Sequence, residues 1–266
     1  MNTRKISFTK MVASGNDFVV VDGKFTVKFP SMARLLCDRK LGIGADGLLV
    51  LNSSKKADIR MRIFNADGSE AKMCGNGARC IALYMGKRTV SIETAAGIIE
   101  SKVSGNNVKI KLTRPEGIKL DMPIKLNRRP LRVNFVDTGV PHVVVFVAGI
   151  DKIDVVNLGR LIRNHKAFSP DGANVNFVEV IDDSNIKVRT YERGVEDETL
   201  ACGTGSVASA IVTRRMLQTT GQQNKINVKT QGGEVLKVYF DNDNGRISNV
   251  WLEGKVKTVY KGEWNV

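Results

Sequence analysis

The sequence predicts an α+β fold of two tandem, pseudo-symmetric domains, each rich in strands and built around a central helix. The first observation is that the motif Cys-Gly-x-Gly occurs twice, at residues 74–77 and 202–205, each time where a helical pattern begins. The second is a series of matching segments in the same order in both halves, namely residues 15–18 with 139–142, Arg34 with Arg160, Gly47 with Asn174, Phe64 with Tyr191, and Thr94 with Thr230. Insertions in loops explain why the spacing drifts, and a repeat this long indicates duplication of a whole domain.

The repeat divides the chain into an N-terminal domain over residues 1–117 and a C-terminal domain over residues 118–266. The predicted join lies around residues 115–130, where Pro115, Gly117, Pro123 and Pro130 interrupt the strand patterns. Each domain then has a length that is ordinary for a single core.

The first half alternates short strands with two helices. In residues 59–64, Ile59, Met61 and Ile63 alternate with arginines, which is typical of a strand with one buried face. After Cys74, apolar residues follow at helical spacing until Gly86. The predicted order is strands at 6–8 and 18–21, a helix at 32–40, strands at 48–51 and 59–64, the helix opened by Cys74, and strands at 91–94, 98–103 and 108–112. The second half repeats this order, with a strand at 186–191 and a helix at 206–216.

Bulk composition indicates a folded cytoplasmic protein. Hydrophobic residues make up 42% of 266 residues, and no apolar stretch approaches the ~20 residues of a spanning helix. Residues 1–5 lead directly into a strand pattern and not into an apolar signal core. The four cysteines lack zinc-site spacing and there are only two histidines, so no metal site is expected. Because no apolar stretch is long enough to span a bilayer, no membrane role is expected either.

The net charge of +14 permits a nucleic-acid-binding role. The basic residues are nevertheless spread along the chain, do not alternate with aromatic residues, and cluster only as pairs such as Arg128-Arg129. We therefore expect a solvated basic surface and no nucleic-acid partner.

The cysteine of each motif is a candidate acid/base group. A helix N-terminus offers unpaired backbone N–H groups and the positive end of the helix dipole, which favour a thiolate and can hold a carboxylate. Two such cysteines facing one substrate could remove a proton from one face of a carbon and return one to the other. Cys37 and Cys80 have no cysteine at the corresponding repeat position and are predicted to be core residues, and His165 is predicted to lie on the surface.

Several segments of the sequence together resemble those of a known family. Residues 64–70 and 73–80, residues 191–194 and 201–205, and the segments 15–18 and 174–177 are similar to those of diaminopimelate epimerases across essentially the whole chain. The resemblance implies two domains, each a barrel-like sheet around a central helix, with the last strand crossing to the first domain. It also implies a homodimer and a small-molecule substrate.

The family reaction interconverts LL- and meso-2,6-diaminopimelate without a cofactor, on the route to lysine and peptidoglycan. By resemblance Cys74 and Cys202 are the two acid/base residues, with Cys74 the base for the LL isomer and Cys202 for the meso isomer. His142 and Glu192 occupy family positions that help to set cysteine ionisation.

The resemblance also implies a set of substrate contacts. The backbone of Gly75, Asn76, Gly203 and Thr204 would hold the reacting carboxylate. Arg193 is suited to a second carboxylate, which it can grip in bidentate fashion. The remaining implied contacts are Asn16, Asn65, Asn174 and Glu192. Val140 and Gly47 depart from the amides common in the family, so a broader substrate range is one expectation.

Two alternatives stay open from the sequence. One is a cofactor-independent racemase of the same fold that acts on another amino acid, of the histidine or proline type. The other is a basic nucleic-acid-binding module, which only the net charge favours.

Overall fold

The computed structural model describes residues 5–23, 28–217, 225–243 and 245–265. Residues 1–4, where the sequence was read as lacking a signal core, lie outside this part. The chain forms two compact units: unit 1 is Met1–Ile110 with Gly254–Val266, and unit 2 is Lys111–Glu253. The domain boundary expected after residue 117 comes from the repeat and stays a prediction.

Unit 1 is a closed barrel of eight strands. Pairing runs β1–β2–β3–β4–β6–β7–β8–β17 and returns from β17 to β1. Its elements are β1 (Lys5–Ala13), β2 (Asn16–Asp22), α1 (Phe29–Cys37), β3 (Gly47–Asn52), β4 (Ile59–Asn65), β5 (Glu70–Ala71), α2 (Gly75–Tyr84), β6 (Thr89–Thr94), β7 (Gly97–Ser104), β8 (Asn107–Lys111) and the end of β17 (Arg246–Asn265).

Unit 2 repeats this plan element by element. Its strands pair in the order β9–β10–β11–β12–β13–β15–β16–β17. The elements are β9 (Glu116–Leu126), β10 (Arg129–Asp137), β11 (Pro141–Phe146), η1 (Ile150–Lys152), α3 (Val155–Arg163), η2 (Lys166–Phe168), β12 (Asn174–Asp182), β13 (Asn185–Glu192), β14 (Asp197–Thr199), α4 (Gly203–Leu217), β15 (Lys225–Lys229), β16 (Val235–Asp243) and the start of β17. The parallel pairs β11–β12 and β13–β15 correspond to β2–β3 and β4–β6, which confirms the predicted pseudo-symmetric fold.

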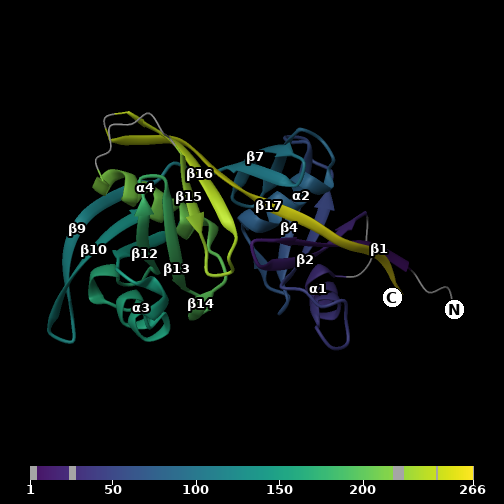
Figure 1. Cartoon of the computed structure of the whole chain (residues 1–266). Coiled ribbons are helices and arrows are strands. Elements are labelled where there is room, and N and C mark those ends of the chain that lie inside the picture. Colours follow the sequence, from purple (N-terminus) through teal and green to yellow (C-terminus); the bar gives the residue numbers. More distant parts are fainter. Residues whose placement is uncertain (1–4, 24–27, 218–224, 244, 266) are drawn as a thin grey trace. The chain divides into compact units, whose positions relative to one another are not determined.

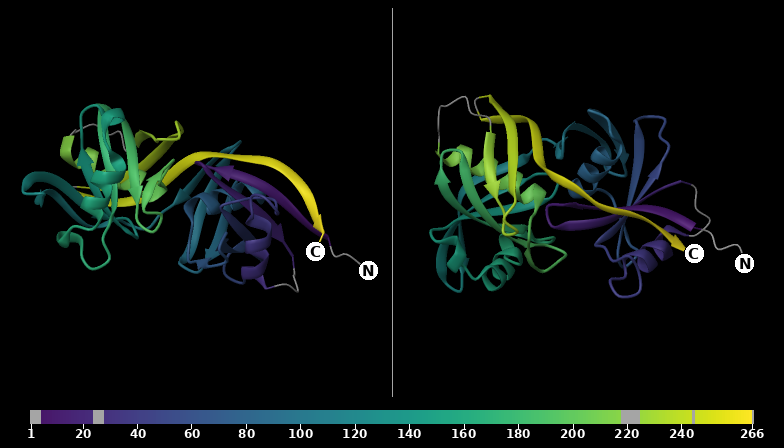
Figure 2. Two further views of the ribbon diagram at one scale, coloured as in Figure 1. Left: turned by 90° about the horizontal axis from the view of Figure 1, so that it is seen from below. Right: turned by 45° about the vertical axis from the view of Figure 1, so that its right-hand side comes forward.

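The last strand belongs to both units. Residues of β17 from Arg246 to Glu253 pair with β16 in unit 2, and those from Val256 to Asn265 pair with β1 in unit 1 (Figures 1 and 2). Within unit 1 this end of β17 occupies the place that β9 takes beside β10 in unit 2.

Each unit places one helix among its strands. In unit 1, α2 contacts β1, β2, β4, β6 and β7, and in unit 2, α4 contacts strands from β9 to β16. Small residues make this possible: a Cβ added to Gly77 would lie 3.0 Å from Leu49 Cδ2, and one added to Gly205 would lie 2.2 Å from Asn176 Oδ1. A helix buried on all sides needs small or apolar residues on every face.

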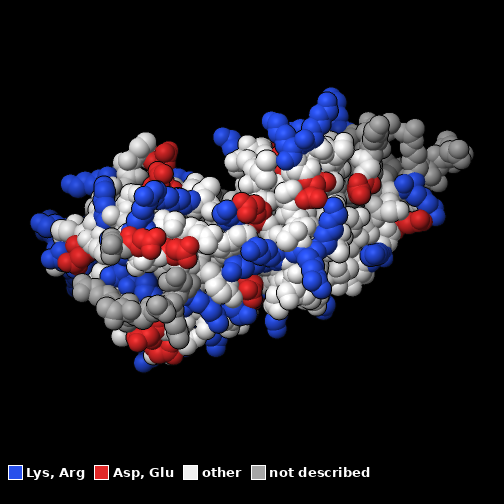
Figure 3. Space-filling view, turned by 90° about the horizontal axis from the view of Figure 1, so that it is seen from above, with Lys and Arg blue, Asp and Glu red and all other residues white. Residues whose placement is uncertain are grey.

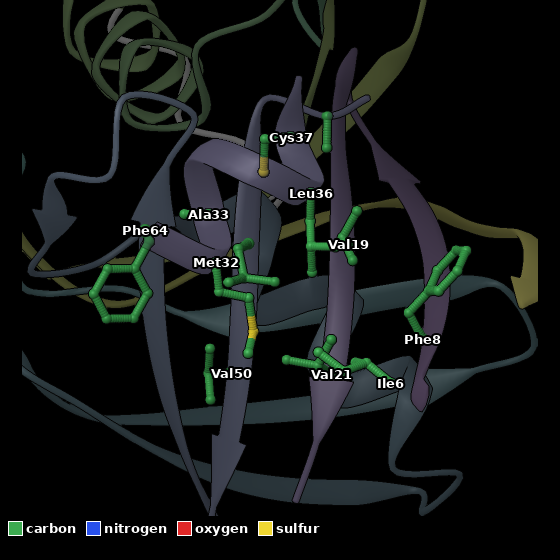
Figure 4. Close-up of a cluster of buried hydrophobic side chains, with 12 residues drawn as sticks. Ile6, Phe8, Val19, Val21, Met32, Ala33, Leu36, Cys37, Val50 and Phe64 are labelled. Atoms are coloured by element: carbon green, nitrogen blue, oxygen red, sulfur yellow. The ribbon is translucent and has the colours of Figure 1, made fainter. Parts of the chain in front are cut away.

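The second helix of each unit packs outside the sheet. Helix α1 begins at Phe29, with Pro30 in its first turn, and ends at Cys37, so it starts and stops earlier than the expected 32–40. Its buried face, with Met32, Leu36 and Cys37, lies against Val19 and Val50 of the adjacent strands (Figure 4). Burial of Cys37 and Cys80 agrees with the core role predicted for both.

Candidate functional site

Cys74 is the N-cap residue of α2. Its backbone is extended, its carbonyl accepts the helical hydrogen bond of Ala78 N at 2.9 Å, and its Sγ accepts a hydrogen bond from Gly77 N at 3.4 Å. The side chain is partly exposed. The sulfur therefore stays reachable while it caps the positive end of a buried helix, a position in which a thiolate is the better acceptor.

Cys202 holds the same position before α4 but in a different environment. Its carbonyl accepts Ser206 N at 2.9 Å, and its Sγ lies 3.5 Å from Thr204 Oγ1. Burial, followed by the negative charge of Glu192, raises the pKa of this thiol to about 12. Hydrogen bonds from Thr204 and Gly205 act in the opposite direction and are weaker. The expectation that the helix N-terminus lowers the thiol pKa is thus wrong for Cys202, because desolvation and the charge of Glu192 outweigh the hydrogen bonds offered at this helix end.

A buried polar network supports the Cys74 turn. Asn76 Nδ2 donates to Asn16 Oδ1 at 2.6 Å, while Asn76 Oδ1 accepts from Arg79 Nη2 at 2.6 Å. Arg79 also donates to Ser14 Oγ at 2.6 Å and is fully buried. Asn16 and Asn76 are therefore held together as expected for neighbours in one site, and the arginine that joins them to the β1–β2 turn was missed by the sequence analysis.

Asn65 lies in a tight turn at the end of β4. Its Nδ2 donates to Ser69 Oγ at 2.9 Å, and Asp67 accepts hydrogen bonds from Ser69. Gly68 closes the turn at a positive φ of 87°. The Asn65 side chain is exposed at a fixed position, which suits a binding residue.

Glu192 ends β13 in unit 2, and Arg193 follows it in a turn. Burial raises the pKa of Glu192, and a hydrogen bond of 3.1 Å from Thr199 Oγ1 only partly offsets this. The backbone N of Arg193 donates to Asn174 Oδ1 at 2.9 Å, and Asn174 Nδ2 donates to Pro141 O at 3.3 Å. Asn174 thus fixes the backbone at Arg193, with both ends of its amide in use.

Among the described residues, the guanidinium of Arg193 makes only long contacts with protein. Its Nη1 lies 3.4 Å from Asp171 O and 3.5 Å from Gly172 O. Over the described ranges, no carboxylate lies within ion-pair distance of it. It is therefore available for an external carboxylate.

His142 is fully buried on β11, and its Nδ1 lies 3.1 Å from Asn176 Nδ2. Burial, followed by the charge of Arg193, lowers the pKa of His142 to about 3. The imidazole is neutral at physiological pH. The buried partner Asn176 was not among the predicted site residues.

A hollow of about 450 Å³ lies elsewhere on unit 2. Its lining includes Arg114, Glu116, Arg215 and Arg246. It contains none of the predicted site residues, so its volume is no guide to the chemistry of the cysteines.

Comparison with known proteins decides the family. The chain matches the sequence model described as diaminopimelate epimerase over residues 8–117 and 134–259. The chain belongs to the diaminopimelate epimerase family. It is 42% identical to the diaminopimelate epimerase of Caldanaerobacter subterraneus subsp. tengcongensis, with 96% of this chain and 98% of that protein covered. The diaminopimelate epimerase of Archaeoglobus fulgidus is 43% identical, with 97% and 96% covered.

Solved structures of related fold include other isomerases. A Bacillus anthracis phenazine biosynthesis protein of the PhzF family gives a TM-score of 0.75 at 19% identity, with 99% of this chain and 100% of that chain covered. A hydroxyproline epimerase from Agrobacterium vitis gives 0.69 at 16% identity, with 99% and 93% covered. At these identities the likeness shows the fold alone. In the part of the chain that is described, no helix is long and apolar enough to cross a membrane.

Proposed function

We propose that this protein interconverts LL- and meso-2,6-diaminopimelate without a cofactor, with Cys74 and Cys202 as the two acid/base residues. The observation that supports this most is the repeated placement of a cysteine before the buried central helix of each unit. The full-length similarity to diaminopimelate epimerases supplies the substrate.

In the proposed reaction, one thiolate removes the α-proton and the opposite thiol donates a proton to the other face of the carbon. The electron pair of the broken C–H bond moves onto the substrate carboxylate and returns to carbon when the new C–H bond forms. After one turnover the two sulfurs have exchanged protonation states. Backbone N–H groups of Gly75, Asn76, Gly203 and Thr204 would stabilise the carboxylate charge as it develops.

The unequal environments of the cysteines support a direction for each. Cys202 is held as a thiol by burial and by Glu192, which suits the acid that completes epimerisation of the LL isomer. Cys74 accepts an N–H hydrogen bond at a helix N-terminus, which suits the base. In the reverse direction, the role proposed for Glu192 is to help Cys202 lose its proton, and the raised pKa of Glu192 favours this role because it makes the carboxylate a stronger base.

Substrate specificity would come from contacts with the second amino-acid group of diaminopimelate, the one that does not react. The guanidinium of Arg193, which makes only long contacts with backbone carbonyls among the described residues, suits the carboxylate of this group, with Asn65 and Glu192 as further contacts. The function implies a cytoplasmic enzyme of lysine synthesis, and the homodimer stays a prediction. Basic and acidic side chains are interspersed on the face drawn in Figure 3, which supports a solvated surface on that face.

Deuterium exchange tests this function directly. Purified protein in D2O, without added cofactor, is expected to replace the α-hydrogen of LL-diaminopimelate and to produce the meso isomer, measured by proton NMR and chiral chromatography. A panel containing proline, hydroxyproline and histidine separates the alternatives. Exchange of one of these amino acids without exchange of diaminopimelate would identify another racemase, and no exchange by folded protein would refute proton transfer at the α-carbon.

The effect of Glu192 on Cys202 gives a separate prediction. In Glu192→Gln the negative charge that raises the pKa of Cys202 is lost while burial remains, so this pKa is expected to fall. The pH midpoint of iodoacetamide modification at Cys202, followed by mass spectrometry, should therefore shift downward. Modification of Cys74 in the same sample is the internal control. An unchanged Cys202 midpoint would show that Glu192 does not control this thiol.

A further inference from the structure

His142 and Asn176 form a buried polar pair on adjacent strands. Both side chains are 0% exposed, and Asn176 Nδ2 lies 3.1 Å from His142 Nδ1. The same Nδ2 donates to Val143 O at 3.1 Å, and Asn176 Oδ1 accepts from Thr190 Oγ1 at 3.0 Å. Every polar atom of the asparagine side chain is therefore engaged.

These partners fix which way the amide points. A backbone carbonyl only accepts, so the NH2 end of Asn176 must face Val143 O. The Thr190 hydroxyl then donates to Oδ1. Since the NH2 group also faces His142 Nδ1, that ring nitrogen must accept and cannot carry a proton.

The imidazole proton consequently lies on Nε2. The ring is neutral because burial, followed by the positive charge of Arg193, holds its pKa at about 3. Within the described ranges, Nε2 is shielded from solvent and has no hydrogen-bond partner. A buried N–H left without an acceptor costs free energy, so a donor kept in this state points to a ligand.

The repeat shows that the fold does not require this pair. The positions equivalent to His142 and Asn176 in unit 1 are Phe18 and Leu49, on the matching parallel strands. Leu49 packs at Gly77 as Asn176 packs at Gly205. One barrel therefore fills this place with apolar side chains, and the other uses two polar groups that are costly to bury.

We propose that Asn176 is a positioning residue that locks His142 as the neutral Nε2–H tautomer, so that His142 serves the site as a hydrogen-bond donor and not as a base. The role in the site rests on the proposed function, whereas the tautomer is a property of the resting protein. The acceptor would be a negative charge, a thiolate or a substrate carboxylate. An Nε2–H donor stabilises such a charge without removing a proton from a cysteine.

Nitrogen-15 NMR of histidine-labelled protein tests the tautomer. The chain has two histidines, and His165→Gln assigns the signals. The expected His142 spectrum shows a protonated Nε2 and an unprotonated Nδ1, unchanged as the pH passes the ordinary histidine pKa of about 6.5. A protonated Nδ1, or titration near that pH, would overturn the proposal even if the protein proves active on diaminopimelate.

Variants of the pair test the role of Asn176. In Asn176→Asp a carboxylate can only accept, so the proton is expected to move to Nδ1 and the pKa of His142 to rise. Thr190→Val is the matched control, because Val143 O still orients the amide and the tautomer should stay. If Asn176→Asp does not fold, Asn176→Leu, which copies unit 1, should leave Nδ1 without its donor and yield a tautomer mixture. A wild-type spectrum from either folded variant would refute the assignment.

Activity distinguishes a donor from a base. His142→Gln keeps an N–H donor near the position of Nε2, whereas His142→Leu does not. If His142 is a donor, kcat for epimerisation should fall about 10- to 100-fold further in the leucine variant than in the glutamine variant. Equal loss in both folded variants would exclude the donor role. If neither the wild type nor any variant reacts with diaminopimelate, the proposed function fails while the NMR result stands.

Discussion

Replacing Cys74 or Cys202 with alanine is expected to lower the rate of epimerisation by about 10²–10⁴-fold, the contribution typical of a positioned acid or base. Each cysteine would serve one face of the α-carbon, so the remaining sulfur cannot complete the inversion. The rate of conversion of LL- to meso-diaminopimelate, measured by chiral chromatography, tests this. Cys80→Ala is the matched control, because Cys80 lies on the same helix as Cys74 but is fully buried in the core.

Exchange without inversion sharpens this test. In Cys202→Ala, Cys74 can still remove the α-proton of the LL isomer. The rate of α-proton exchange should therefore fall less for the LL isomer than for the meso isomer. Cys74→Ala should show the opposite preference. Equal exchange from both isomers in either variant would contradict the assignment of one cysteine to each face, and full activity in either variant would remove that cysteine from the chemistry.

Replacing Arg193 with lysine is expected to lower kcat/KM for diaminopimelate by about 10- to 100-fold. A charge-assisted hydrogen bond contributes about 1.5–3 kcal/mol, and lysine cannot reproduce the bidentate fork of a guanidinium. The loss should appear mainly in KM, because the distal carboxylate is bound equally in the ground and transition states. Steady-state kinetics over a range of diaminopimelate concentrations measures the split.

Arg163→Lys is the matched control for this variant. Arg163 Nη1 also donates to Asp171 O, at 3.3 Å, but its guanidinium is paired with Glu196 at 2.9 Å. If losing the hydrogen bond to Asp171 O were the whole cause, kcat/KM would therefore fall in both variants. If Arg163→Lys lowers kcat/KM as much as Arg193→Lys does, the effect is structural and Arg193 is not the carboxylate contact.

The fold could be predicted from the sequence because the repeat places the same elements in the same order. The alternation of Ile59, Met61 and Ile63, and the small residues after each cysteine, are local patterns that survive in the structure. Helix α1 was misplaced by three residues at each end, since Pro30 starts it earlier than the apolar pattern indicates. Closure of the first barrel could not be predicted from local patterns, because β17 pairs with β1 across almost the full length of the chain. Only the family resemblance implied this pairing.

Prediction of the site succeeded where a local motif exists and failed where partners are distant in sequence. Arg79 joins Ser14 to Asn76, and Asn176 joins His142 to Thr190, through hydrogen bonds between separate elements. No spacing rule connects such residues. A comparison of the two halves could have indicated the His142–Asn176 pair, because the equivalent residues of the first half, Phe18 and Leu49, are apolar.

By itself the sequence determined the duplication, the helix-capping position of Cys74 and Cys202, and the chemistry that a thiol at a helix N-terminus permits. Only the tertiary structure decided that these two thiols differ. The dipole of a helix end is encoded locally, but desolvation depends on everything packed around the sulfur. Burial beside Glu192 therefore raises the pKa of Cys202, although its motif matches that of Cys74, which stays partly exposed.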